Sequence, residues 1–287
     1  MAAELEHARL ERGARTRRWL LEQQRDGPAR ERARGQRRLL ERQRAVQQQR
    51  QLGGGELGAV EEVQGRSVRS RDVRVLTWNL FHGRSVPPSG RSLQREFADA
   101  LAAWAWDVAL LQEVPPWYPE PLAAAAGADF RLQLTSRNWL PALRRAISLR
   151  NPDILKSNGG GCNAILVRGE PILAERAQRL RRWPEGRWVH GVRLSGGWVA
   201  NVHAHNRPRH AAQADCERAI AAVRGWGDLL VFGGDVNLRH PSFPGLIHVA
   251  GNHVDHLFTD GRAAAGQAQV LDRGVLSDHP PVAVTLA

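Results

Sequence analysis

Five short polar clusters stand at the ends of apolar runs and carry residue types that can do chemistry. They are Trp78-Asn79, Gln112-Glu113, Asn201-Val202-His203, Gly234-Asp235-Val236-Asn237 and Ser277-Asp278-His279. Carboxylate and amide oxygens hold hard divalent cations in proteins, and histidines transfer protons near neutral pH. If the five strand ends meet in space, they predict a metal-dependent site that handles phosphate.

The fourth cluster places two polar side chains on one face of the chain. Asp235 and Asn237 are two residues apart, and residues at this spacing share a face of an extended segment. Gly233 and Gly234 let backbone and ligand approach closely. A carboxylate beside an amide suits an attacking water and a phosphate oxygen, although a simple turn at the Asp explains the same pattern.

Glu113 and Asn79 follow apolar runs that read as strands. A carboxylate next to a hydrophobic strand is costly to bury without a partner, so Glu113 either reaches solvent or meets a cation. Asn79 could orient a metal ligand or bind a phosphate oxygen. Asn is also a common turn residue, and that alternative stays open for Asn79.

The histidines need partners to act in proton transfer. Asp255 is the candidate that would fix the tautomer of His279. His203 and His205 share a strand face, and either could protonate a leaving oxygen. A zinc site made of His203, His205 and His210 is the alternative, which no paired cysteines or His-Glu-x-x-His motif supports.

From residue 73 the chain mixes short β-type runs with helical patterns. We expect strands at 73–80, 107–111, 163–167, 171–180, 188–194, 198–202, 228–232, 254–258, 267–271 and 282–286. Helical spacing is expected at 93–106, 118–126, 140–149 and 209–224. Because the strands come in hairpin-like groups, this pattern favours two packed, largely antiparallel sheets flanked by helices over a doubly wound parallel sheet.

Charge and composition set limits on location and partners. The chain of 287 residues has a formal net charge of +12, which favours polyanionic partners. Residues 1–50 hold 14 arginines and seven acidic residues, a net of +7, so the rest carries only +5. Two cysteines make no disulfide framework, and we expect Cys162 and Cys216 to be buried thiols. With no signal-peptide pattern and no apolar run of about 20 residues, we expect a cytoplasmic, reduced protein without a membrane span.

The order and neighbours of the clusters resemble the endonuclease/exonuclease/phosphatase superfamily, the deoxyribonuclease I-like fold. The matching stretches are 74–79, 107–113, 161–168, 201–203, 234–237, 254–255 and 277–279. The resemblance covers about three quarters of the chain. It implies a four-layered α/β sandwich, in which two mostly antiparallel sheets pack together between helices. It also implies a Mg²⁺ or Mn²⁺ site where the sheets meet.

The resemblance implies a role for each matching residue. Those near the metal are Asn79, Glu113 and Asp278. Those with catalytic roles are His203, Asp235, Asn237, Asp255 and His279. Asp235 would orient or deprotonate water, and Asn237 would hold the phosphate. His279, oriented by Asp255, would contact the scissile phosphate, and His203 would stabilise the transition state or protonate the leaving group. Arg187 stands where some DNA-cutting members carry a phosphate-binding arginine.

We expect two domains in the chain. Residues 1–66 would form a basic helical or partly disordered extension and linker, and residues 70–287 would form the catalytic domain. Three interpretations of the extension stay open: a solvated arm, a nucleic-acid-binding or partner-binding arm, and the product of a start codon placed too far upstream. Gly53-Gly54-Gly55 marks a flexible joint.

Three functions are compatible with these residues. We expect a monomeric, divalent-metal-dependent phosphodiesterase, with nucleic acid as its substrate, which makes it a nuclease. The alternative is a phosphomonoesterase or a lipid or inositol phosphate hydrolase with the same site. A more remote alternative is a non-catalytic nucleic-acid-binding protein. The sequence differs from exonuclease III-type enzymes in one respect. Those enzymes carry a tyrosine near the position that precedes the His203 strand, whereas Tyr118, the one tyrosine here, lies far from it.

Overall fold

Short apolar runs form two six-stranded sheets in the computed structural model, which describes residues 72–287. The first sheet has the order β11 (Gln269–Val270), β12 (Val282–Leu286), β1 (Val73–Asn79), β2 (Val108–Val114), β4 (Cys162–Val167) and β3 (Asp129–Leu134). The second has the order β5 (Ala174–Arg181), β6 (Arg187–Leu194), β7 (Gly197–His203), β8 (Leu229–Asp235), β10 (Asp255–Thr259) and β9 (Ile247–Asn252). The extension expected over residues 1–66 lies outside the described residues.

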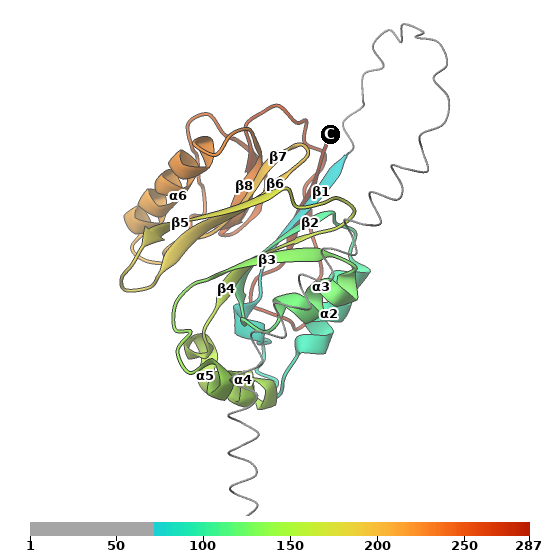
Figure 1. Cartoon of the computed structure of the whole chain (residues 1–287), viewed down its shortest axis with the longest axis vertical. Helices are drawn as coiled ribbons and strands as arrows, with labels where there is room; N and C mark the ends of the chain where they lie inside the picture. The colour runs from blue at the N-terminus through green and yellow to red at the C-terminus, as the bar shows by residue number, and fades with distance from the viewer. Residues whose placement is uncertain (1–71) are drawn as a thin grey trace, which may run out of the picture. The chain divides into compact units, whose positions relative to one another are not determined.

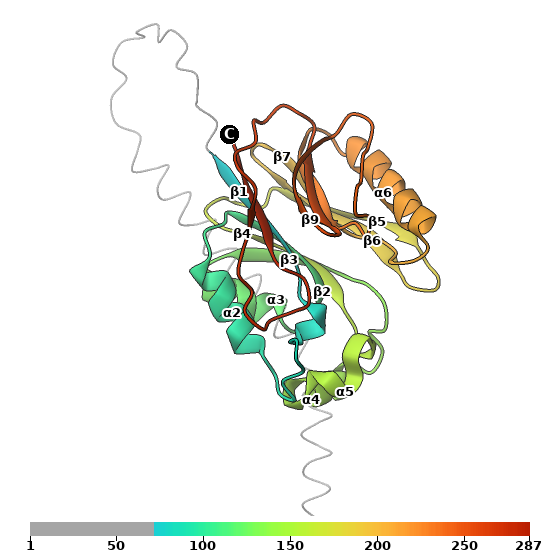
Figure 2. The same cartoon turned by 180° about the vertical axis from the view of Figure 1, so that it is seen from behind.

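The helices lie in the connections between the strands. The α-helices are α2 (Gln94–Ala103), α3 (Pro119–Ala126), α4 (Pro141–Arg150), α5 (Pro152–Leu155) and α6 (Arg209–Arg224). Two short 3₁₀ helices are η1 (Phe81–Gly83) and η2 (Lys156–Gly159). Helices α2 and α3 cover the outer face of the first sheet, and α6 covers the outer face of the second (Figure 1; Figure 2).

Strand alternation divides the apolar side chains among three cores. Successive side chains of a strand point to opposite faces, so Val75 packs between the two sheets while Leu76 packs under the helices. The core between the sheets joins Val108 and Leu110 of the first sheet to Val231 of the second. The result is helix, sheet, sheet, helix, which confirms the expected four-layered sandwich.

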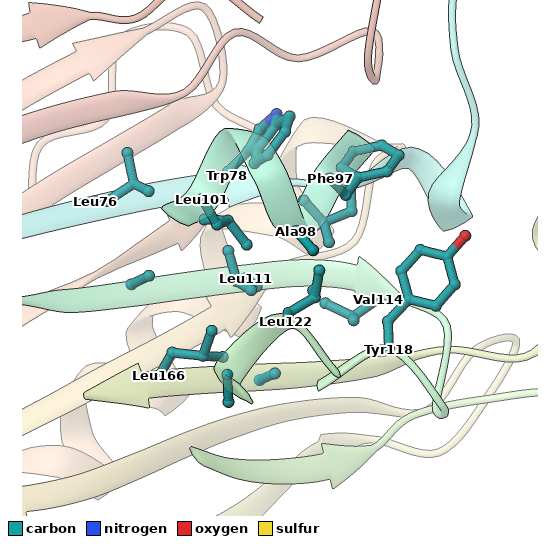
Figure 3. Close-up of a cluster of buried hydrophobic side chains, with 14 of the residues drawn as sticks. Leu76, Trp78, Phe97, Ala98, Leu101, Leu111, Val114, Tyr118, Leu122 and Leu166 are labelled. Carbon is teal, nitrogen blue, oxygen red and sulfur yellow. The ribbon is translucent and has the colours of Figure 1, made fainter. Parts of the chain in front are cut away.

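The core under α2 and α3 combines the rings of Trp78, Phe97 and Tyr118 with aliphatic side chains (Figure 3). The ring centroids of Trp78 and Phe97 lie 5.1 Å apart, and both side chains are fully buried. Leu111 and Leu122 join them from β2 and α3. Burying one such side chain stabilises the fold by roughly 1.5–3 kcal/mol. This core fixes β1, which carries Asn79 at its end.

One parallel pair in each sheet gathers the polar strand ends. β1 runs parallel to β2, and β7 runs parallel to β8, so the two strands of each pair have their carboxyl ends at the same end of the sheet. β12 runs antiparallel to β1, and β10 runs antiparallel to β8, so both begin at that end. This topology brings all five polar clusters to one end of the sandwich.

Two strands were not expected from the sequence. β3 and β9 each lie at the end of a sheet and are mostly exposed or half-buried. An end strand has one unpaired side and lacks a continuous apolar run, so its pattern is weak. β3 leads directly into residues 135–140, which connect it to α4.

Candidate active site

Residues from four of the five clusters border a cavity of about 270 Å³ between the strand ends. Its lining includes Glu113, His203, Asp235, Asn237 and His279. Asn79 and Asp255 are buried directly behind it, because their side chains contact Asp235 and His279. Arg187 also lines the cavity, so the structure brings together eight of the nine residues expected to act, all but Asp278.

Asp235 lies at the centre of the hydrogen-bond network. It ends β8, is 2% exposed, and accepts a hydrogen bond of 2.9 Å from Nδ2 of Asn79 and one of 3.1 Å from the backbone NH of Asn237. Burial and the nearby charge of Asp255 raise the pKa of Asp235 to about 7. Such a carboxyl group is poised to exchange a proton near neutral pH.

Asp255 and His279 form a hydrogen-bonded dyad. Nδ1 of His279 donates to Oδ2 of Asp255 at 2.7 Å, and Oδ1 of Asp255 is buried without a hydrogen-bond partner among residues 72–287. Burial lowers the pKa of His279, but the hydrogen bond and charge of Asp255 outweigh it and raise the pKa to about 9. The imidazole therefore carries a positive charge at neutral pH, and Asp255 directs its other nitrogen away from the dyad.

The loop before β12 holds His279 in place. Ser277 Oγ donates to the carbonyl of Asn79 at 2.6 Å and accepts from the backbone NH of His279 at 3.1 Å. The indole NH of Trp78 donates to the carbonyl of His279 at 2.9 Å. Ser277 has φ of 60°, a conformation that costs energy for a non-glycine residue. The loop is thus tied to the end of β1.

Glu113 reaches the cavity because β2 is irregular at its end. The register between β2 and β4 shifts between Leu111 and Val114, and Glu113 itself has φ of 50°. A β-bulge of this kind re-aims a side chain. Oε2 of Glu113 lies 3.1 Å from Nε2 of His82, and Oε1 lies 3.8 Å from Nε2 of His203.

His82 is a residue of the site that sequence reasoning missed. It lies in η1 with φ of 55°, and its Nδ1 lies 3.2 Å from the carbonyl oxygen of Gly160. It lines the cavity together with His203 and His279. The one sequence signal for His82 is its position three residues after Asn79, because a turn that directly follows β1 lies close to the strand ends that form the site.

His203 differs from His279 in its electrostatics. Nε2 of His203 lies 3.5 Å from Oδ2 of Asp235, and the side chain is almost wholly buried. Burial, together with the positive charge of Arg187, lowers the pKa of His203 well below its ordinary value of 6.5. His203 is therefore a neutral imidazole that can donate or accept a hydrogen bond.

Arg187 supplies a buried positive charge at the cavity wall. It is 6% exposed, and one terminal nitrogen lies 2.7 Å from Oε2 of Glu185. Its Nε is buried without a partner among the described residues. Because Arg187 lines the cavity, its guanidinium charge is suited to attract an anionic oxygen bound there.

Asp278, His205 and His210 lie apart from the cavity lining. The Asp278 side chain is 43% exposed, and its Oδ1 lies 3.8 Å from Nε2 of His279. In the part of the chain that the structure describes, the group of potential ligands that comes closest together is Asp235, Asp255 and His279. The alternative zinc site of three histidines therefore gains no support from the structure.

The donor set fits a hard divalent cation. Glu113 and Asp235 both line the cavity, and both approach Nε2 of His203. The Glu113 side chain is 22% exposed, so its oxygens are accessible from the cavity. Mg²⁺ and similar ions take one or two carboxylates and fill their remaining positions with water and phosphate oxygens.

A model of the endonuclease/exonuclease/phosphatase family matches residues 76–279, and the chain belongs to this family. Its members are hydrolases that act on phosphate ester bonds, and the chain is a hydrolase of this class. Members of the family generally use divalent metals. No curated protein matches the sequence. Within the described residues, no helix is long and apolar enough to cross a membrane.

Solved structures share the fold at low sequence identity. An endonuclease/exonuclease/phosphatase protein from Bacteroides vulgatus matches with a TM-score of 0.58 and 14% identity, over 76% of this chain and 99% of that one. One from Beutenbergia cavernae gives 0.58 and 19%, over 76% and 72% of the two chains. Truncated TDP2 from Caenorhabditis elegans gives 0.54 and 18%, over 75% and 97%.

Proposed function

We propose that this hydrolase cleaves a phosphodiester bond of nucleic acid by direct attack of water, with Mg²⁺ or Mn²⁺ bound at Glu113. The observation that carries the proposal is the convergence of Asp235, the Asp255–His279 dyad and Arg187 on one cavity. A negatively charged proton acceptor and two fixed positive groups are what hydrolysis of an anionic ester requires.

Asp235 activates the attacking water in this scheme. Asn79 and the backbone of Asn237 each hold one of its carboxylate oxygens, so the group cannot rotate away. A fixed carboxylate can orient water and accept its proton as the oxygen approaches phosphorus.

The positive groups stabilise charge on the phosphate. His279 presents the ring nitrogen that Asp255 does not engage, and Arg187 places its guanidinium charge at the cavity wall. Donors that are already in place act without reorganisation when charge develops in the transition state. Nδ2 of Asn237 is fixed at 3.0 Å from the carbonyl of Ala204, which holds this amide at the cavity wall to contact a phosphate oxygen.

His203 acts on the leaving oxygen. Its Nε2 faces Glu113 and Asp235, and its burial keeps the ring in one orientation. As a neutral imidazole it donates a hydrogen bond, which stabilises negative charge on the departing oxygen. This role complements that of the charged His279.

The cation would be held chiefly by Glu113, with Asn79 and Asp278 as the further ligands expected from the resemblance. Oδ1 of Asn79 already accepts a hydrogen bond of 2.9 Å from the backbone NH of Phe81, and Asp278 lies outside the cavity lining. Bound there, a divalent cation neutralises phosphate charge and lowers the pKa of water.

The proposal of nucleic acid as substrate rests on charge and on the family. The net charge of +12 favours a polyanion, and the family is described by its endonucleases and exonucleases. Incubation of purified chain with labelled single-stranded and duplex oligonucleotides, with Mg²⁺ or Mn²⁺, tests it. Failure to cut any of them, combined with turnover of inositol or lipid phosphates, would reject it.

A small phosphate ester is the second candidate, and the size of the cavity favours it. About 270 Å³ accommodates a phosphate and little more than one attached sugar. A panel of phosphomonoesters, inositol phosphates and diesters, each compared with Asp235→Ala, separates the two candidates. The three interpretations of the extension at 1–66 stay open, and its removal in the same assays tests whether it binds nucleic acid.

A further inference from the structure

Two loops that wall the active-site cavity are locked to each other. Residues 135–140 connect β3 to α4, and residues 182–186 connect β5 to β6. Ser136 Oγ accepts a hydrogen bond of 2.5 Å from the backbone NH of Gly186, and Arg137 pairs with Glu185 at 2.5 Å. Glu185 also pairs with Arg187, so both loops are anchored to the buried arginine of the site.

Each loop exposes a tryptophan two residues from this junction. Trp139 is 64% exposed and Trp183 is 82% exposed. They are the two exposed members among the nine tryptophans of residues 72–287. Exposing a large aromatic ring is unfavourable, and both rings belong to loops that line the active-site cavity, which indicates a binding surface.

Trp139 is held as a rigid platform. The guanidinium of Arg144 lies 4.3 Å from the centroid of its ring, and Arg144 is itself 8% exposed. The cation–π contact fixes the orientation of the indole. A fixed ring with open surface can stack on another planar group at little entropic cost.

The charge around the two rings is positive. Residues 135–150 contain four arginines and no acidic residue. Residues 179–187 contain four more arginines, of which Arg181 pairs with Asp215. Their one acid, Glu185, is already paired with Arg137 and Arg187. Aromatic rings set among arginines are how proteins bind unpaired nucleic-acid strands, because bases stack on the rings and phosphates meet the cations.

We propose that Trp139 and Trp183 stack on unpaired bases of a nucleic-acid strand whose phosphate occupies the active-site cavity. The substrate is then single-stranded, or is unpaired near the scissile phosphate, because a duplex hides the faces of its bases. This inference rests on the proposed phosphodiesterase function and adds the strand type to it.

A lipid surface is the competing ligand, because Leu143 and Ile154 of α4 and α5 are also more than half exposed. Arginine-flanked tryptophans and leucines can enter a membrane interface. Two observations favour nucleic acid. The Trp139 ring is stacked on a buried guanidinium and cannot move freely, and Trp183 lies on the loop that carries Glu185 into the cavity wall.

The test measures binding by the full chain carrying Asp235→Asn, which slows cleavage. The probes are a short fluorescein-labelled single strand, in DNA and RNA forms, the matching duplex, and vesicles containing anionic phospholipid. Trp139→Ala with Trp183→Ala is expected to weaken single-strand binding about tenfold or more. Trp139→Phe with Trp183→Phe should keep most of the affinity, and Leu173→Ala, at another exposed apolar residue, should change nothing.

Three results would overturn the inference: unchanged single-strand affinity in the double alanine variant, duplex binding as tight as single-strand binding, or loss of vesicle binding alone. Hydrolysis of bis(p-nitrophenyl) phosphate by the unaltered chain separates this failure from that of the proposed function. If the unaltered chain hydrolyses that diester while the tryptophans prove irrelevant, only the inference fails. If it cleaves neither the diester nor any oligonucleotide, the proposed function fails.

Discussion

The side-chain amide of Asn79, at the end of β1, donates a hydrogen bond of 2.9 Å to the carboxylate of Asp235, at the end of β8. The two residues come from different sheets, so this bond joins the sheets at the site itself. Both side chains are almost wholly buried. The geometry of the catalytic cavity therefore depends on the packing of the whole sandwich.

Asp255→Asn should lower kcat about 10²- to 10⁴-fold on any substrate that the chain turns over. The amide cannot hold His279 through a charged hydrogen bond, so the imidazole loses both its fixed tautomer and its positive charge. Steady-state kinetics measure the loss, with circular dichroism to confirm folding. Because the two residues act as a unit, Asp255→Asn with His279→Ala should cost little more than His279→Ala alone; fully additive losses would contradict the dyad.

Hydrolytic activity should be abolished by chelation of divalent cations and restored by adding Mg²⁺ or Mn²⁺. Glu113→Gln should raise the cation concentration needed for half-maximal activity about tenfold or more, because a neutral amide binds hard cations weakly. Asp278→Asn is the comparison, and a smaller shift is expected because that carboxylate is half exposed. Isothermal titration of the cation gives a readout independent of turnover. A larger shift for Asp278→Asn would reverse our assignment.

A buried polar contact beneath the site should contribute to stability. Nε2 of Gln112 donates to Oδ1 of Asn201 at 2.8 Å across the sheets, and Nδ2 of Asn201 donates to the carbonyls of Leu111 and Ala164. Asn201→Ala removes these three buried hydrogen bonds, and we expect a loss of about 1–3 kcal/mol in the free energy of unfolding. Urea denaturation measures it, and Gln178→Ala, on the exposed face of β5, should change stability by less than about 0.5 kcal/mol.

Stability should fall in mild acid because of His256. Burial lowers the pKa of His256, which donates from Nε2 to the carbonyl of Leu238 and lies 2.9 Å from His248 through Nδ1. The unfolded chain binds a proton near the ordinary pKa of 6.5, whereas the folded chain resists it to lower pH. The free energy of unfolding therefore decreases as pH falls below about 6.5 and is insensitive to this group above that value.

Urea denaturation at about pH 7.5 and about pH 5.5 measures this dependence. His256→Gln should reduce the difference between the two conditions, because glutamine does not titrate. Replacement of the exposed His210 by Gln is the matched control and should leave the difference unchanged. An equal pH dependence in the His256 variant and the unaltered chain would contradict the assignment.

The strand-end residues could be predicted because each follows a recognisable apolar run. Asp235 and Glu113 are found from local pattern and from their order along the chain, and the parallel pairs then bring them together. The fold class was predictable for the same reason, since strands buried on both faces have a strong pattern. Whether these residues bind a cation and act as assigned stays a prediction.

The rest of the site depends on contacts between distant loops. His82 enters the cavity through a turn with positive φ, which nothing in Phe-His-Gly specifies. The bond between Ser136 and Gly186 and the pairing of Arg137 with Glu185 join segments about 50 residues apart. Such contacts follow from tertiary packing, so the rigid loops that carry Trp139 and Trp183 could not be predicted from local sequence.

The central claim is that Asp235 activates water for attack on phosphorus. The most direct measurement compares kcat of the unaltered chain and of Asp235→Asn on bis(p-nitrophenyl) phosphate with saturating Mn²⁺. Asparagine matches the shape of the carboxylate but cannot accept the proton, so we predict a loss of about 10²-fold or more, with folding unchanged by circular dichroism. Activity of Asp235→Asn within about threefold of the unaltered chain would contradict the account.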